Sequence, residues 1–386
     1  MSMSGNSLVI GIYYHPEAYP PTLNAVNELS GSFDAIRIVH RPHLKGDWKY
    51  PANVTAIPSG RPISAEDQQR ASLPRKIFFF LQFVLSLLKQ SWIKRPRVIL
   101  LYDAYALFAY RLIRPLLPFR HILWYHNHDI SEIGRERKFS IGWFACKNEK
   151  KIFDDIDIFT LPSSERLAYF PMDVFKGAYF IVPNYPSLKF YGSYYKANRS
   201  LDSIKLIFQG RIGEGHGLEE IIPLLASPVS GKQVSLVLKG HCDERYKQSL
   251  IDRAKAADVE DKLTFIGFTP YEEVPKLASG CHVGIGIFAK KEVMHVTLGT
   301  ASNKLYEYAA LGLPILYSKE EHFSRYLDRY NWAFAVEPNI GSIREKLVEI
   351  ISNYEFYSVS AHESFRSALN FESCFEPVQK AISDKR

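Results

Sequence analysis

The sequence predicts an α/β protein made of two doubly wound domains, each a parallel sheet covered by helices on both faces. Three observations support this fold class. The chain has 386 residues, and single hydrophobic cores rarely grow beyond roughly 250–300 residues. Short apolar, β-branched runs alternate with helical patterns along most of the chain. The alternation is interrupted at 187–200, a polar and aromatic stretch that is typical of a linker between domains.

The first domain is predicted over residues 1–186 and the second over 201–359, and the segment at about 360–386 is expected to pack back on the first domain. Strands of the first domain are expected at 8–14, 34–40, 98–102, 121–126, 157–161 and 178–182. Strands of the second are expected at 204–209, 234–239, 263–266, 282–287 and 314–317. Ligands of such folds bind at the carboxyl ends of the strands, so we expect a cleft shared by the two domains.

The composition is that of a globular protein, with 46% hydrophobic and 23% charged residues. Four cysteines are scattered without a CxxC motif or metal-like spacing, which predicts a reducing compartment and no disulfide framework. The first residues lack the basic region of a signal peptide. A cytoplasmic location is therefore expected.

The excess positive charge lies entirely in the first half of the chain. Residues 1–187 hold 23 Lys and Arg against 16 Asp and Glu, which equals the net charge of +7 of the whole protein. Part of this charge flanks an apolar run from Ile77 to Leu88, with Arg75 and Lys76 before it and Lys94 and Arg95 after it. Twelve residues are too few to span a bilayer, which needs roughly 20. Basic ends around an apolar helix favour contact with an anionic membrane surface at the inner face of the cell membrane, and a buried helix is the alternative.

The most informative segment is 302–315, SNKLYEYAALGLPI. Its pattern predicts a helix that begins near Ser302 and Asn303, ends at Gly312, and is followed by a strand. Free N–H groups at a helix start favour an anion, and Lys304 adds a positive charge. Glu307, one turn later, can accept hydrogen bonds from a diol such as a ribose. The spacing indicates a nucleotide site, and an ordinary surface helix packed on a sheet is equally compatible with the helix alone.

This segment resembles the donor-binding helix of glycosyltransferase family 4, whose members have the two-domain GT-B fold. Two further stretches strengthen the resemblance. The first is Gly210-Arg211, followed after five residues by Gly217-Leu218, which is similar to the family's phosphate-binding loop. The family often has Lys where this chain has His216. The second is 263–270, LTFIGFTP, which is similar to the family's Phe-x-Gly strand and turn and places Phe268 near the nucleobase.

Two strand ends complete the expected site. Lys239 ends an apolar run and can pair with a leaving diphosphate, although a solvated lysine at a strand end is equally compatible with the pattern. In the first domain, Tyr125-His126-Asn127-His128-Asp129 follows another apolar run. By the resemblance, His128 is the catalytic-site residue of this domain and Asp129 orients it. His126 has a structural role in the alternative interpretation.

The resemblance implies a retaining, metal-independent enzyme that moves a sugar from a nucleotide diphosphate sugar, its co-substrate, to a glycan or lipid-linked acceptor in cell-surface polysaccharide or lipopolysaccharide synthesis. Arg211, Lys239 and Lys304 would stabilise the charge that grows on the diphosphate. One departure concerns Gly299, which stands near the position where the family usually has a first glutamate; backbone N–H groups at 300–302 or a side chain from 290–298 are expected to hold the sugar instead.

Other interpretations are kept or set aside on particular residues. A nucleotide-sugar epimerase of similar fold and a non-catalytic nucleotide-sugar-binding protein remain alternatives. Asp155-Ile156-Asp157 has the spacing of a metal–diphosphate motif but precedes a strand instead of following one, so no metal is assigned. No nucleic-acid-binding motif accompanies the basic charge.

Overall fold

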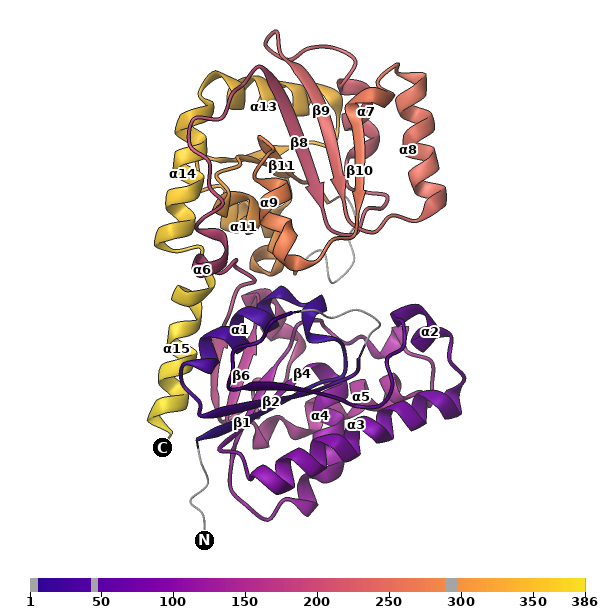
Figure 1. Cartoon of the computed structure of the whole chain (residues 1–386), viewed down its shortest axis with the longest axis vertical. Helices are drawn as coiled ribbons and strands as arrows, with labels where there is room; N and C mark the ends of the chain where they lie inside the picture. Colours follow the sequence, from indigo (N-terminus) through magenta and orange to yellow (C-terminus); the bar gives the residue numbers. More distant parts are fainter. Residues whose placement is uncertain (1–5, 43–47, 289–296, 386) are drawn as a thin grey trace. The chain divides into compact units, whose positions relative to one another are not determined.

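The computed structural model describes residues 6–42, 48–288 and 297–385. It divides into two compact units (Figure 1). Unit 1 comprises residues 1–183 and 374–386, and unit 2 comprises 184–373. The stretch 187–200, which we expected to be a linker, lies in unit 2, where it forms the short helix α6 (Leu188–Tyr191). Ser187 there donates a 2.6 Å hydrogen bond to Glu372.

Unit 1 contains a seven-stranded parallel sheet in the order β3-β2-β1-β4-β5-β6-β7. The strands are β1 (Ser7–Ile12), β2 (Ala35–His40), β3 (Val54–Pro58), β4 (Val98–Tyr102), β5 (Ile122–His126), β6 (Ile158–Leu161) and β7 (Ala178–Ile181). Six of them were predicted. The order reverses between β1 and β4, which pair in register with Ile10 opposite Leu100. Such a reversal is where doubly wound sheets bind ligands.

Helices cover both faces of this sheet. They are α1 (Pro20–Ser30), α2 (Ala65–Arg70), α3 (Leu73–Lys94), α4 (Asp103–Ile113), α5 (Ile141–Glu149) and, from the end of the chain, α15 (Phe371–Asp384). Apolar side chains of α3 and α4 share one core with β1, β4, β5 and β6. On the other face, Trp124 of β5 packs against Phe375 of α15 at 5.9 Å between ring centroids. Residues 374–386 belong to unit 1, whereas the sequence predicted that the segment at about 360–386 packs on the first domain.

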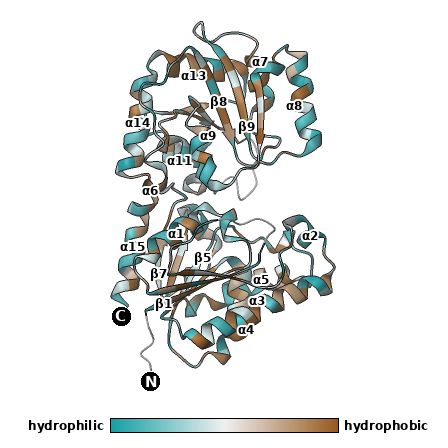
Figure 2. Cartoon of the chain, viewed as in Figure 1, coloured by the Kyte–Doolittle hydropathy of each residue, from teal (hydrophilic) through white to brown (hydrophobic). Residues whose placement is uncertain are grey.

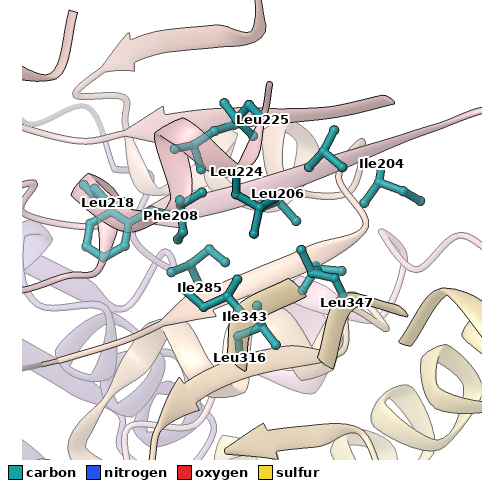
Figure 3. Close-up of a cluster of buried hydrophobic side chains, with 14 of the residues drawn as sticks. Ile204, Leu206, Phe208, Leu218, Leu224, Leu225, Ile285, Leu316, Ile343 and Leu347 are labelled. Atoms are coloured by element: carbon teal, nitrogen blue, oxygen red, sulfur yellow. The ribbon is translucent and has the colours of Figure 1, made fainter. Parts of the chain in front are cut away.

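Unit 2 contains a six-stranded parallel sheet in the order β10-β9-β8-β11-β12-β13. The strands are β8 (Ser203–Gln209), β9 (Gln233–Lys239), β10 (Leu263–Gly267), β11 (Val283–Gly286), β12 (Ile315–Ser318) and β13 (Ala333–Val336). The helices include α7 (Leu218–Leu224), α8 (Glu244–Ala256), α9 (Val274–Ala278), α11 (Asn303–Ala310), α12 (Glu321–Leu327), α13 (Ile340–Ser352) and α14 (Tyr354–Ser367). Leu206 and Phe208 of β8 and Leu316 of β12 face Leu218, Ile343 and Leu347 in the core between the sheet and α7 and α13 (Figure 3).

The predicted fold class is confirmed, since both units are parallel α/β sheets of the doubly wound type. Short 3₁₀ helices lie at Pro16–Ala18, Arg114–Leu116, Ile133–Arg135, Lys150–Asp155, Ser164–Tyr169, Glu260–Lys262, Tyr271–Glu273 and Gly299–Ala301.

The apolar run from Ile77 to Leu88 lies within the 22 residues of α3, which is long and apolar enough to cross a membrane by length and composition. One face of α3, however, is buried in the core of unit 1.

Candidate functional site

Three loops at the carboxyl ends of β8, β9 and β10 are joined by backbone hydrogen bonds. The N–H of Gly210 donates to the carbonyl of Lys239, and the N–H of Gly240 donates to that of Gly267, both at 2.9 Å. Gly210 and Gly240 have φ angles of 120° and 134°, which L-residues rarely adopt. A Cβ at Gly240 would overlap the carbonyl of Gly210. Glycine at these positions therefore allows the loops that carry Arg211 and Lys239 to close against each other.

Helix α11 packs unusually close to the sheet because β11 has glycine on the side that faces it. A Cβ at Gly284 would overlap the ring of Tyr308, and one at Gly286 would overlap Leu305. The Tyr308 hydroxyl also accepts a 2.9 Å hydrogen bond from the backbone N–H of Gln209 at the end of β8. The start of α11 is thus fixed beside the reversal of strand order between β8 and β11. The prediction that a helix begins near Ser302 and Asn303 and ends before Gly312 is confirmed.

Lys304, on the first turn of α11, is held by aromatic rings. Its Nζ lies 3.7 Å from the centroid of the Phe208 ring and 4.7 Å from that of Phe288. Burial lowers the pKa of Lys304 to about 7, and the carboxylate of Glu307 partly opposes this shift. Within the described residues, no carboxylate oxygen lies within 4.0 Å of this ammonium group. An incoming anion would therefore find a cation without a salt-bridge partner there.

A cavity of about 740 Å³ opens at this point of unit 2. Its lining includes three residues that the sequence singled out: Arg211, His216 and Lys304. The Nδ1 of His216 lies 3.1 Å from the carbonyl oxygen of Ile287, so Nδ1 carries a proton and donates it. Arg211 is exposed on the loop between β8 and α7, which also carries His216. The cavity is large enough for a drug-sized ligand, and its lining carries two cations and this imidazole besides the acidic residues Glu214 and Asp243.

A buried polar group lies next to this cavity. The carboxylate of Glu307 accepts a short hydrogen bond from Nε2 of Gln209, and burial raises the pKa of Glu307 to about 7, while Tyr191 and Lys239 lower it. Burial lowers the pKa of Lys239, and Glu307 and Glu273 oppose that shift. Oε1 of Gln209 has no hydrogen-bond partner within the described ranges. Gln209, which the sequence analysis did not identify, thus offers an acceptor for a hydroxyl group at the end of β8.

The remaining donor-site candidates lie elsewhere. Ser302 is buried in the extended conformation that precedes α11, and Asn303 is the first residue of the helix. Phe268 follows β10 and is 84% exposed. Neither these three nor Lys239 and Glu307 are among the residues that line the cavity. Most of the segment 290–298, proposed above as a source of sugar contacts, lies outside the described residues.

In unit 1, His128 lies at the carboxyl end of β5 and is enclosed on all sides. Its Nε2 is 2.8 Å from the Thr22 hydroxyl, its Nδ1 is 3.2 Å from Nε2 of His126, and its ring stacks between those of Tyr19 and Tyr102. Burial lowers the pKa of His128 well below its usual range, and the neighbouring His126 and Arg166 add to this effect. Burial likewise lowers the pKa of His126 to about 3. Both rings are neutral near pH 7.

Within the described residues, the His128 ring contacts Thr22, His126 and two tyrosines, and no side-chain contact with Asp129 orients it as expected. Asp103 instead holds this loop: its Oδ1 accepts hydrogen bonds from the backbone N–H groups of His128, at 2.7 Å, and Asp129, at 3.2 Å. Asp103 has a φ angle of 61°, a strained conformation for this residue. Burial raises the pKa of Asp103 well above its usual range, and the nearby Asp129 carboxylate raises it further. The sequence signal was an aspartate directly after the apolar run at 98–102.

The discounted Asp155-Ile156-Asp157 motif lies at the amino end of β6, as predicted. Oδ2 of Asp157 accepts a 2.9 Å hydrogen bond from the backbone N–H of Leu123, and Oδ1 lies 3.5 Å from the Lys385 ammonium group. Within residues 6–42, 48–288 and 297–385, no group of three or more His, Cys, Asp or Glu side chains is arranged to hold a metal ion.

Comparison with known proteins places these features in a wider context. Residues 195–363 match the model of the family described as glycosyl transferases group 1. A search of curated protein sequences found no match. Among solved structures, sucrose-phosphate synthase from Thermosynechococcus elongatus aligns with a TM-score of 0.71 at 14% identity, over 98% of this chain and 99% of that one.

Two further structures align over nearly the whole chain. Anabaena Alr3699/HepE in complex with UDP and glucose has a TM-score of 0.67 at 14% identity, over 98% of this chain and 99% of its own. WaaG, a glycosyltransferase involved in lipopolysaccharide biosynthesis, has a TM-score of 0.62 at 14% identity, over 97% and 99%. These likenesses show that the two units have the GT-B fold.

Proposed function

We propose that this chain, a glycosyltransferase by its group 1 domain, moves a sugar with retention of configuration from a nucleotide diphosphate sugar to a glycan or lipid-linked acceptor. Unit 2 would bind the donor and unit 1 the acceptor. The observation that carries the proposal is Lys304, an ammonium group over two aromatic rings at the wall of a cavity that Arg211 also lines. A diphosphate supplies the anion that this arrangement lacks.

The chemistry follows from charge. When the bond between the anomeric carbon and the diphosphate breaks, negative charge grows on the leaving oxygen. Cations that are already in place stabilise this charge without reorganisation, and a site with low water content strengthens their effect. Lys304 and Arg211 would contact the diphosphate, and the start of α11 adds its dipole. Glu307 and Gln209, behind the cavity, offer oxygen acceptors for ribose hydroxyl groups, as the resemblance to family 4 implies.

Retention and independence of metal ions are proposed on the same resemblance, and Lys304 and Arg211, which line the cavity, would supply the positive charge that a metal ion would otherwise give the diphosphate. A role in cell-surface polysaccharide or lipopolysaccharide synthesis is supported by the outer face of α3. Phe78 and Leu85 are 57% and 63% exposed there, and α3 contains no acidic residue. Hydrophobic residues run along α3 and α4 (Figure 2). We propose that this face contacts anionic lipid at the inner side of the cell membrane.

A panel of nucleotide diphosphate sugars tests the proposal. Each donor is incubated with the protein, and release of the nucleoside diphosphate is followed by phosphorus NMR with and without EDTA. We expect at least one donor to be hydrolysed slowly, and the first-formed sugar to keep the anomeric configuration of the donor. The Lys304→Met variant should lose this activity. No release from any donor, together with no binding by calorimetry, would refute a donor site in unit 2.

A further inference from the structure

A second cavity, of about 360 Å³, lies in unit 1 at the reversal of strand order between β1 and β4. Tyr13 and Tyr14 follow β1, and Tyr105 lies on the first turn of α4, directly after β4. The start of α5 and the turn between α2 and α3 close the other sides. We propose that this cavity holds the sugar of an acceptor that is carried on a lipid phosphate. The inference rests on the proposed function and names its acceptor class.

The walls of the cavity have the chemistry that binds a sugar ring. Tyr13 and Tyr105 stack with 5.1 Å between ring centroids and 7° between their planes, and Tyr13 is fixed from behind by Phe83 at 5.2 Å. Flat aromatic surfaces of this kind cover the C–H face of a sugar. Tyr13 is buried, whereas Tyr105 and Tyr14 are half-buried, so the accessible ring surface belongs to Tyr105 and Tyr14.

A carboxylate is positioned beside these rings. The carboxylate of Glu136 and the hydroxyl of Tyr105 both lie close to Gly142. A Cβ at Gly142 would overlap Glu136 and would lie 2.5 Å from the Tyr105 oxygen. Ser140 donates a long hydrogen bond of 3.4 Å to Oε2 of Glu136. Carboxylate oxygens accept hydrogen bonds from pairs of sugar hydroxyl groups. Glycine at 142 thus leaves room for the carboxylate at the cavity wall.

Two cations and an apolar surface adjoin the same cavity. Lys76 and Arg137 belong to its lining and supply positive charge for a phosphate. Leu73, which also lines it, is the first residue of α3 and is 44% exposed. From Leu73 the exposed apolar face continues along α3 through Ile77, Leu81 and Leu85. The order sugar, phosphate and hydrocarbon chain therefore matches the order aromatic cavity, cation pair and apolar helix face.

Aromatic side chains in mutual contact lead from the cavity to His128 at the carboxyl end of β5. Tyr14 lies 6.2 Å from Tyr105 and 6.3 Å from Tyr19, measured between ring centroids, and Tyr19 stacks on His128 at 4.7 Å. Burial raises the pKa of Tyr14, and the negative charges of Asp103, Glu136 and Asp129 raise it further. A sugar in the cavity would thus lie two aromatic side chains, Tyr14 and Tyr19, away from His128.

The test uses octyl glycosyl phosphates of glucose, galactose and N-acetylglucosamine below their micellar concentrations, with saturation-transfer NMR and calorimetry as readouts. At least one should bind, with saturation strongest on the ring protons and the first methylene groups. Lys76→Gln should weaken it by about tenfold or more, the scale of a lost charge-assisted hydrogen bond. Arg75→Gln is the matched control, because Arg75 neighbours Lys76 on α3 but does not line the cavity.

The sugar contact has its own pair of variants. Glu136→Gln should weaken the octyl glycosyl phosphate and the uncharged octyl glucoside alike, whereas the control Glu132→Gln should change neither. Equal binding to wild type, Lys76→Gln and Glu136→Gln, or no binding of any of the three phosphates, would overturn the inference. The panel of nucleotide diphosphate sugars is titrated into the same samples. Donor binding without glycosyl phosphate binding refutes only this inference, whereas a wild-type protein that binds none of the donors refutes the proposed function.

Discussion

Lys304 should take up a proton when a nucleotide diphosphate sugar binds. In the free protein its pKa is lowered to about 7 because the ammonium group is buried over two aromatic rings. At pH 8 about nine in ten free molecules therefore hold a neutral Lys304, and at pH 6 about one in ten do. A bound diphosphate favours the charged form and raises the pKa again. Binding at pH 8 should then take up about 0.9 proton at this side chain, and binding at pH 6 about 0.1.

The same linkage fixes the direction of the pH dependence. The affinity for the nucleotide diphosphate sugar should be highest below pH 7 and should fall as the pH rises above 7. The titration of Lys304 alone should make binding about tenfold weaker at pH 8 than at pH 6. UDP-glucose is the suitable ligand because its phosphates do not titrate in this range. Calorimetric titrations in buffers of different ionisation enthalpy give the number of protons taken up as the slope of the apparent enthalpy.

The variant Lys304→Met isolates the contribution of this side chain from those of His216 and Glu307, which are retained. It should bind UDP-glucose more weakly by about 1.5–3 kcal/mol, the scale of a hydrogen bond to a charged group. Its proton uptake at pH 8 should be smaller than that of the wild type by nearly one proton. Identical uptake in the two proteins would show that Lys304 does not titrate on binding, and would refute the argument from its burial.

Three further predictions concern separate parts of the molecule. Glu307→Ala should weaken nucleotide binding by about 1–3 kcal/mol with the fold intact, because a charged hydrogen-bond acceptor is lost; unchanged affinity by calorimetry would exclude a ribose contact. Gly284→Ala should lower the free energy of unfolding by about 1–3 kcal/mol in urea titrations, because the new methyl group meets the Tyr308 ring; a change below 0.5 kcal/mol would mean that α11 can move without cost. Each basic residue at the ends of α3 contributes about 1 kcal/mol to binding near an anionic surface. Replacing Arg75, Lys76, Lys94 and Arg95 with Gln should therefore reduce sedimentation of the protein with phosphatidylserine vesicles at low salt without changing its UDP affinity. Equal sedimentation of variant and wild type would favour a surface without membrane contact.

The sequence predicted the fold because the central strands of both sheets are buried on both faces. Such strands must be apolar along their whole length, as in the run at 98–102, and this pattern is easily read. The two strands that were missed, β3 and β13, lie at sheet edges. β3 has one buried residue, Val54, and Thr55 interrupts its apolar residues, whereas β13 is a run of four apolar residues, too short to distinguish from a buried turn of helix.

The residues that line the cavity of unit 2 were predicted in part, for a physical reason. Arg211, His216 and Lys304 were found because they belong to local motifs in which glycine or a helix start accompanies the charge. Gln209 and Asp103 were missed, since their importance depends on contacts with residues 98 and 25 positions away in the sequence. The cavity beside Tyr13 was not predicted either. Its walls come from four separate segments whose proximity is decided by strand order, which spacing along the chain does not encode.

The central claim is that unit 2 binds the diphosphate of its donor through Lys304 and Arg211. A crystal structure of the protein with UDP tests it most directly. We expect the diphosphate in the cavity of about 740 Å³, with phosphate oxygens within about 3 Å of the Lys304 ammonium group and Arg211 turned toward them. UDP bound elsewhere with this cavity empty, or bound there with both cations turned away from the phosphates, would contradict the account.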